Sequence, residues 1–99
     1  MNKEIILEEL KSHKEKIREF GVKRLELFGS FAVDAQGANS DIDFLVTFED
    51  NRGDVDDYLG LLHFLEDLFE KRIDLVNKNL IRDELKDTIM NGVMHVAKV

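Results

Sequence analysis

The sequence predicts an α/β (α+β) domain in which a small β-sheet is covered by helices on one face. Apolar residues recur with a helical period in some segments and alternate with polar residues in others. Helix-like and strand-like segments are also interspersed along the chain, which is typical of sheets packed against helices. The 99 residues suit one compact domain over residues 1–99.

The first helix is expected over residues 3–20. Asn2 is suited to cap its start, and Gly21 stands where a glycine commonly ends a helix. Five residues of this segment are spaced by three or four positions and share one helical face: Ile6, Leu10, His13, Ile17 and Phe20. We interpret His13 as a packed residue at the edge of this face, because no second metal ligand is near it in the sequence.

The remaining elements follow from alternation, capping and turn residues. Residues 30–35 form a short helix or turn and 35–40 a loop, while residues 49–54 form a turn in which Asp54 caps the next helix. Gly92 ends a last helix. We expect strands at 22–28, 41–48 and 72–76, helices at 54–70 and 80–91, and an edge strand within 93–99.

The formal net charge is −7, and ten of the 21 acidic residues lie between Asp41 and Glu70, where Arg52 is the one base. Such a surface repels a phosphate backbone, so we expect no nucleic-acid partner. The sequence has no signal-like apolar stretch and no window close to the ~18 apolar residues of a membrane span. We therefore expect a cytoplasmic protein without a membrane partner.

Asp41 and Asp43 stand at the start of the second strand, separated by Ile42. Residues two apart in a strand point to the same side, so the two carboxylates should project together while Ile42 enters the core. Asp74 lies between two apolar residues of the third strand, so it should face away from them. If the second and third strands are neighbours, the three carboxylates lie together. They could then hold two Mg²⁺ ions for phosphoryl chemistry.

Gly29 and Ser30 follow the first strand directly. Glycine lets the backbone approach a ligand closely, and a turn after it presents free N–H groups to an anion. The Ser30 hydroxyl adds a donor. The pair therefore predicts a phosphate cradle facing the carboxylates, although a Gly-Ser pair or a lone Asp-x-Asp is by itself commonly a plain turn or a chance pattern.

Together, "LFGSFAVDAQGANSDIDFLV" and the later "RIDLV" resemble the minimal nucleotidyltransferases of the DNA polymerase beta-like superfamily. The resemblance covers nearly the whole chain and implies the nucleotidyltransferase fold, with a small mixed sheet of three to four strands. It also implies transfer of AMP from ATP to a hydroxyl. Gly29 and Ser30 would bind the nucleotide, and Asp41, Asp43 and Asp74 would be the catalytic metal ligands for Mg²⁺, two ions being expected and Mn²⁺ a substitute.

The family resemblance further implies a partner. Stand-alone domains of this family usually pair with a HEPN toxin and act as its antitoxin by modifying a tyrosine, and the sequence is also compatible with a homo-oligomer. One departure stands out, because many relatives have x-Ala-Arg-Gly after Gly-Ser, and here Val33 and Asp34 replace the arginine and glycine. Loss of that cation would weaken binding of the triphosphate.

Two alternatives stay open at this stage. The chain could be a catalytically impaired binding subunit that inhibits its partner without chemistry, which Val33 and Asp34 favour and the intact aspartates oppose. It could also be a nucleotidyltransferase for small molecules, although such enzymes normally carry an additional acceptor domain. The sequence does not fix the acceptor or the base of the nucleotide.

Overall fold

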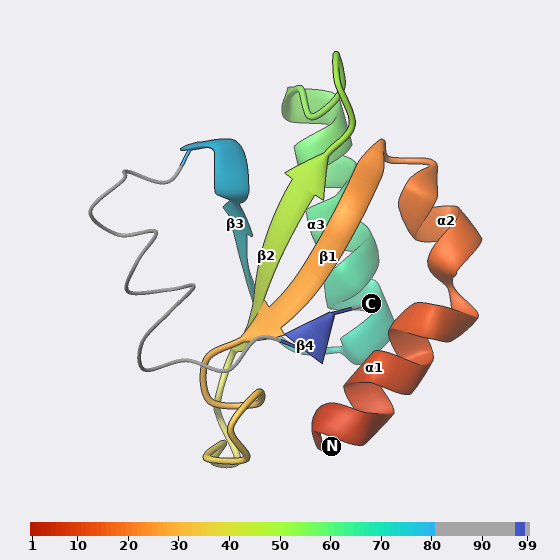
Figure 1. Cartoon of the computed structure of the whole chain (residues 1–99). Helices are drawn as coiled ribbons and strands as arrows, with labels where there is room; N and C mark the ends of the chain where they lie inside the picture. The colour runs from red at the N-terminus through yellow and green to blue at the C-terminus, as the bar shows by residue number, and fades with distance from the viewer. Residues whose placement is uncertain (81–96, 99) are drawn as a thin grey trace.

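A computed structural model of the chain describes residues 1–80, 97 and 98 (Figure 1). Within these residues the strands and the long helix before the third strand follow the order that the sequence predicts. The elements are α1 (Lys3–Ser12), α2 (Lys14–Arg18), β1 (Val22–Phe28), β2 (Ile42–Phe48), α3 (Val55–Phe69), β3 (Ile73–Asn77), the 3-10 helix η1 (Lys78–Leu80) and β4 (Ala97–Lys98).

The strands form one sheet in the order β3-β2-β1-β4. β1 pairs antiparallel with both β2 and β4, whereas β2 and β3 run parallel. A parallel pair needs a long crossover connection, and α3 supplies it. The predicted mixed sheet is therefore confirmed, and so is the final edge strand, at Ala97–Lys98. The helix expected at 80–91 lies outside the described residues beyond Leu80.

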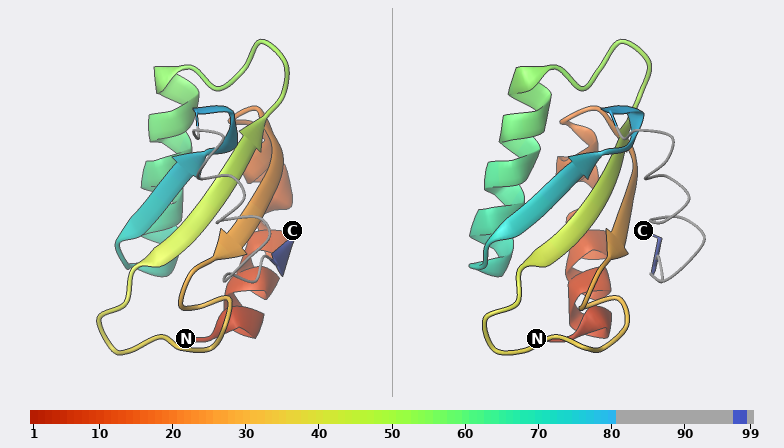
Figure 2. Two further views of the ribbon diagram at one scale, coloured as in Figure 1. Left: turned by 60° about the vertical axis from the view of Figure 1, so that its left-hand side comes forward. Right: turned by 90° about the vertical axis from the view of Figure 1, so that its left-hand side faces the viewer.

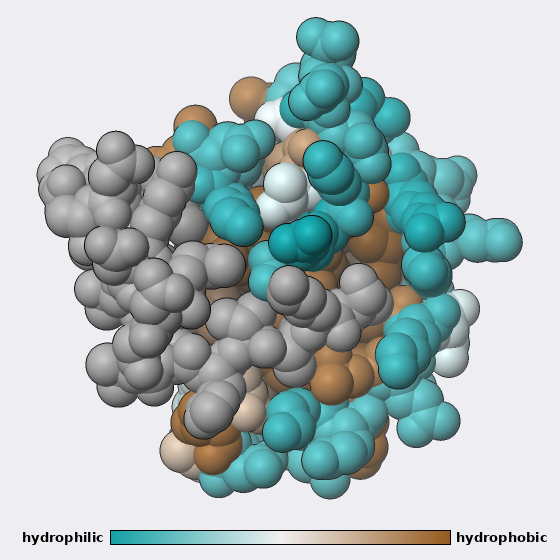
Figure 3. Space-filling view, in the orientation of Figure 1, coloured by the Kyte–Doolittle hydropathy of each residue, from teal (hydrophilic) through white to brown (hydrophobic). Residues whose placement is uncertain are grey.

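The core lies between one face of the sheet and the helices α1, α2 and α3, all on that face in the views of Figures 1 and 2. The apolar residues at alternate positions of β2 are buried as expected, but β1 and β2 also bury residues of the opposite face, among them Glu26 and Leu45. The outer surfaces of α1 and α2 are hydrophilic where Figure 3 shows them. The central buried residues of these elements are Ile6, Leu10, Leu25, Leu27, Ile42, Phe44, Val46, Leu61 and Leu65.

The single helix expected over residues 3–20 is wrong in one respect, because the structure breaks it at His13. The His13 backbone leaves the helical region at φ −113° and ψ 22°. Its ring Nδ1 lies 2.9 Å from the Glu9 carbonyl oxygen, so the side chain competes for a carbonyl that helical N–H groups normally use. The His13 ring packs edge-on against Phe64, as expected of a packed edge residue.

The turn before α3 is held by side chains at the end of the sheet where β1 begins. The Asp54 carboxylate accepts a hydrogen bond from the Asp57 N–H at 2.9 Å, which confirms it as the helix cap. Arg52 donates two hydrogen bonds to Asp57, at 2.9 and 2.8 Å, and a third to the Glu19 carbonyl. The Arg52 guanidinium lowers the pKa of Asp57 to about 2. This arrangement ties α2, the turn and α3 together.

Candidate active site around Gly29, Asp43 and Asp74

The Gly29–Ser30 segment forms a tight turn directly after β1. Gly29 has φ +74°, a conformation that favours glycine. The Ala32 N–H donates to the Gly29 carbonyl at 3.1 Å, and the Ala35 N–H donates to the Ser30 carbonyl at 2.9 Å. Residues 29–35 therefore make a compact turn at the end of β1, in agreement with the sequence.

Gly29 lies against the side chain of Asp43. Phe28 of β1 and Asp43 of β2 are register partners, so the glycine that follows Phe28 reaches the aspartate. A Cβ placed on Gly29 would lie 2.9 Å from the Asp43 Cγ and would overlap its Oδ2 atom. The backbone of the turn and the carboxylate can meet this closely only because residue 29 has no side chain.

Asp43 and Asp74 stand side by side on neighbouring parallel strands, since they are register partners of β2 and β3. The pKa of Asp43 is raised from 3.8 to about 6. Burial is the largest cause, followed by the charges of Asp74 and Asp41 and by a hydrogen bond to Asp74. Crowded carboxylates of this kind are normally balanced by a cation.

Asp41 lies just before β2 and is exposed. Its charge contributes to the raised pKa of Asp43, so it is near the pair. Within residues 1–80, 97 and 98, however, no three carboxylate or imidazole groups are close enough to form a metal-binding group. The structure thus brings Asp43 and Asp74 together and holds Asp41 further out. Two carboxylates with phosphate oxygens and waters are a normal ligand set for Mg²⁺, so the pair fits that ion.

The start of β2 is fixed by contacts on both sides. The Ile42 N–H donates to the Arg72 carbonyl at 3.0 Å, which joins β2 to the beginning of β3. In the preceding loop the Ser40 hydroxyl oxygen accepts a hydrogen bond from the Gly37 N–H at 2.8 Å. These contacts hold the backbone next to Asp41 while its side chain stays in solvent.

Val33 and Asp34 stand where the family resemblance predicts an arginine and a glycine. Val33 is 40% exposed, so its side chain does not pack in the core and leaves room for a longer one. Asp34 has φ +56°. This left-handed conformation suits glycine best and tolerates aspartate. The left-handed backbone at Asp34 therefore explains why the family pattern has a glycine at this position.

Glu26 is a buried polar residue that the sequence analysis did not single out. It is 0% exposed, and neither carboxylate oxygen has a hydrogen-bond partner among the described residues. It pairs with Leu45 across β1 and β2, so it is on the sheet face that also carries Asp43. A buried carboxylate is costly unless it is paired, so Glu26 calls for an explanation. The signal available in the sequence was a glutamate between Leu25 and Leu27.

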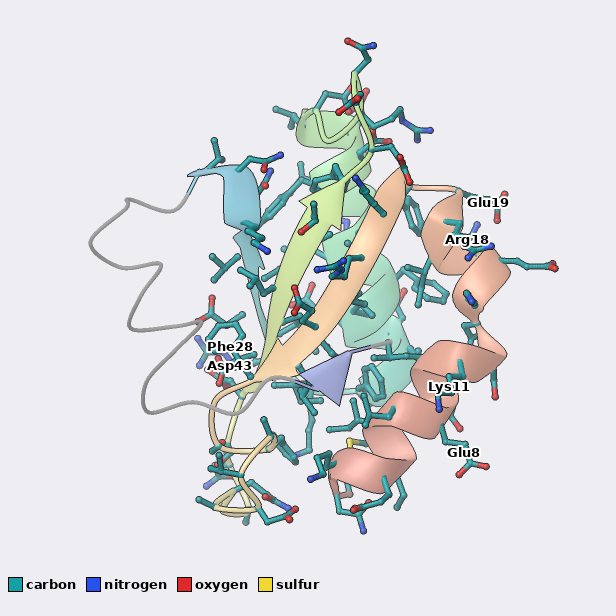
Figure 4. All side chains as sticks on the ribbon, in the orientation of Figure 1. Glu8, Lys11, Arg18, Glu19, Phe28 and Asp43 are labelled. Atoms are coloured by element: carbon teal, nitrogen blue, oxygen red, sulfur yellow. The ribbon has the colours of Figure 1, made fainter. Side chains whose placement is uncertain are left out.

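Figure 4 shows from the front the sheet face that carries Asp43, and Phe28 and Asp43 are labelled close together there.

None of the helices among the described residues is long and apolar enough to cross a membrane.

Comparisons with known proteins identify the family of the chain. The chain matches the family model described as nucleotidyltransferase domain over residues 4–94. Protein adenylyltransferase MntA of Thermococcus cleftensis is 34% identical over 97 residues, which cover 93% of this chain and 97% of that protein.

Solved structures share the fold. The structure of a candidate minimal nucleotidyltransferase superposes with a TM-score of 0.78 at 28% identity and covers 91% of both chains. A toxin–antitoxin structure with AMP-PNP superposes with a TM-score of 0.62 at 22% identity, covering 99% of this chain and 72% of that chain, and this likeness shows the fold alone. With most of its length matched by the family model, the chain belongs to the nucleotidyltransferase domain family and is a minimal nucleotidyltransferase, a transferase.

Proposed function

We propose that the chain transfers AMP from ATP, with Mg²⁺, to a tyrosine hydroxyl of a HEPN toxin and thereby acts as its antitoxin. The observation that carries the proposal is the close approach of the Gly29 turn to Asp43, which is itself paired with Asp74. A phosphate-binding turn and two metal-binding carboxylates then face one reacting phosphate. This arrangement suits transfer of a nucleotidyl group.

Each part of the site has a separate task. The N–H groups of the Gly29–Ser30 turn and the Ser30 hydroxyl would bind the outer phosphates of ATP and orient the α-phosphate. Asp43 and Asp74 would hold Mg²⁺, and Asp41, which lies further out, would turn toward the pair to become a further ligand. Bound Mg²⁺ neutralises phosphate charge and lowers the pKa of a coordinated hydroxyl.

The proposed step balances without a further reactant. The acceptor oxygen forms a bond to the α-phosphorus, the bond from that phosphorus to the bridging oxygen breaks, and pyrophosphate leaves. The acceptor proton goes to Asp74. This residue is exposed at the start of β3 and is therefore accessible to an acceptor from solvent.

The described surface also offers a place for a protein partner. A groove of about 510 Å³ lies between α3 and β3. Three of its lining residues are exposed and apolar, namely Val55 (70%), Leu59 (41%) and Leu80 (80%). Contiguous exposed apolar patches commonly mark interaction sites. The 34% identical relative named protein adenylyltransferase MntA supports the choice of a protein as the acceptor.

The second candidate is an impaired enzyme that inhibits its partner by binding alone. Val33 and Asp34 favour it, because they remove a cation and add a carboxylate beside the phosphate turn. The paired carboxylates favour the active enzyme. We expect slow transfer that depends strictly on Mg²⁺ or Mn²⁺, since loss of one cation lowers rates by about 10²–10³-fold without abolishing them.

The test compares the natural chain with the double variant Val33→Arg/Asp34→Gly. Both proteins are incubated with a HEPN toxin, Mg²⁺ and ATP labelled at the α-phosphate. Faster labelling of the toxin by the double variant supports slow catalysis by the natural chain. Toxin inhibition by the natural chain with no ATP binding and no labelling would establish the binding subunit instead. If the double variant is no faster, residue 33 does not face the phosphates.

A further inference from the structure

Lys71 lies in the turn between α3 and β3, two residues before β3 begins. Its ammonium is 5.9 Å from the centre of the Phe31 ring and donates a 3.5 Å hydrogen bond to the Ala38 carbonyl. Both contacts are in the segment that links the Ser30 turn to Asp41. Figures 1 and 2 show this segment and the turn between α3 and β3 at the same end of the sheet.

The Lys71 ammonium has capacity for an anion. None of the ion pairs among the described residues includes Lys71, and its one hydrogen bond is long. An ammonium has three N–H donors, so at least two remain for a ligand. The aromatic face beneath it stabilises the positive charge without neutralising it. The Lys71 ammonium therefore contacts the segment that follows the Gly29–Ser30 turn and is still able to bind an anion.

Phe31 connects this ammonium to the phosphate turn. The N–H groups of Ser30 and Phe31 donate to no acceptor among the described residues, so both are available to an anion. The Phe31 ring is 1% exposed and therefore fixed in the core. One residue thus carries an available N–H on its backbone and supports the Lys71 ammonium with its ring.

The charge of the site creates a need for such a cation. The carboxylates of Asp41, Asp43 and Asp74 lie near one another, and Asp34 belongs to the turn that follows Gly29. Mg²⁺ on Asp43 and Asp74 would offset part of this charge, but the outer phosphates of ATP also approach the turn that contains Asp34. An ammonium at the rim of this turn supplies attraction that the turn alone lacks.

We propose that Lys71 binds the outer phosphates of the nucleoside triphosphate and makes the site selective for ATP over AMP. This inference rests on the proposed function, since it assigns the residue that holds the leaving group of that reaction. On binding, the lysine side chain would turn from the Ala38 carbonyl toward phosphates held at the N–H groups of Ser30 and Phe31.

The test measures the affinity of the full chain for ATP and, separately, for AMP by calorimetry in Mg²⁺. Lys71→Ala and Lys71→Gln should each weaken ATP binding by about 10-fold, as expected for one charge-assisted hydrogen bond, and leave AMP binding unchanged. Lys71→Arg should retain ATP binding. Lys78→Ala is the matched control, because it removes a lysine just beyond the other end of β3 and should change neither affinity.

The outcomes separate this inference from the proposed function. Equal weakening of ATP and AMP would show that Lys71 only holds the loop through Phe31 and Ala38, and would overturn the inference. Unchanged ATP affinity would also overturn it while leaving AMP transfer intact. A natural chain that binds no ATP would refute the proposed function itself. If the Lys71→Ala protein does not fold, the ATP and AMP affinities of Lys71→Gln test the inference, because the aliphatic part of glutamine still covers Phe31.

Discussion

Asp43→Asn should make the chain more stable when no divalent cation is present. The pKa of Asp43 is raised to about 6, first by burial and then by the charges of Asp74 and Asp41. The folded state therefore binds this proton more tightly than the unfolded state does. Ionisation of Asp43 lowers the free energy of unfolding, and asparagine avoids that loss because it carries no charge.

The size and the pH range of the effect follow from the pKa. A rise from 3.8 to about 6 corresponds to an upper bound of about 3 kcal/mol. Asp43 is only partly buried, so solvent screening reduces the expected gain to about 1 kcal/mol. Well below pH 3.8 the carboxyl is protonated in both states and does not lower the free energy of unfolding. The cost grows as the pH rises and is complete above about pH 7.

Thermal unfolding followed by circular dichroism tests this prediction. At about pH 8 in EDTA, the melting temperature of Asp43→Asn should exceed that of the natural chain by about 4–8 °C. Near pH 4 the difference should nearly vanish. The control is Glu8→Gln, which changes a carboxylate that points to solvent from α1 (Figure 4) and should leave the melting temperature unchanged at both pH values.

Added Mg²⁺ should reverse the order of stability. An ion that binds the folded natural chain raises its melting temperature, and Asp43→Asn should gain much less. The reasoning would be refuted if Asp43→Asn melted below the natural chain at pH 8 in EDTA, because the carboxylate would then be a stabilising part of the fold. Equal gains from Mg²⁺ in both proteins would show that Asp43 is not a ligand.

Three further changes test other parts of the account. In urea denaturation, Gly29→Ala should lower the free energy of unfolding by about 1–2 kcal/mol because of its positive φ alone, and by more because the new Cβ overlaps the aspartate of β2. The control Gly37→Ala should lower it less. Equal losses in the two variants would contradict the close approach of Gly29 to Asp43. Glu26→Leu should raise the free energy of unfolding by about 1–4 kcal/mol, whereas a loss would reveal a partner for Glu26. Arg52→Ala should lower the melting temperature without changing ATP affinity, and weaker ATP binding would be contrary evidence.

Much of the fold was predictable because strand patterns and glycine positions are local signals. The alternation from Ile42 to Phe48 predicts the buried face of β2, and the structure agrees. To predict that Asp43 and Asp74 are close together, the sequence analysis had to assume that β2 pairs with β3. Residue parity states only which side of its own strand each aspartate occupies.

The features that the sequence did not predict depend on side-chain contacts, most of them between distant segments. The break at His13 reflects a ring that bonds the Glu9 carbonyl and packs on Phe64, and helical periodicity contains no information about either contact. Glu26 alternates with leucines as a solvent-facing residue would, because burial of the second sheet face depends on tertiary structure. The contact of Lys71 with Phe31 joins residues 40 positions apart.

The central claim is that the site around Gly29, Asp43 and Asp74 transfers AMP to a toxin tyrosine. The most direct measurement compares labelling of a purified HEPN toxin from ATP labelled at the α-phosphate with labelling from ATP labelled at the γ-phosphate. The account predicts label from the α-phosphate alone, in the presence of Mg²⁺, and no label with Asp43→Asn or with a toxin whose tyrosine is replaced by phenylalanine. Label from the γ-phosphate, or undiminished α-label with Asp43→Asn, would contradict it.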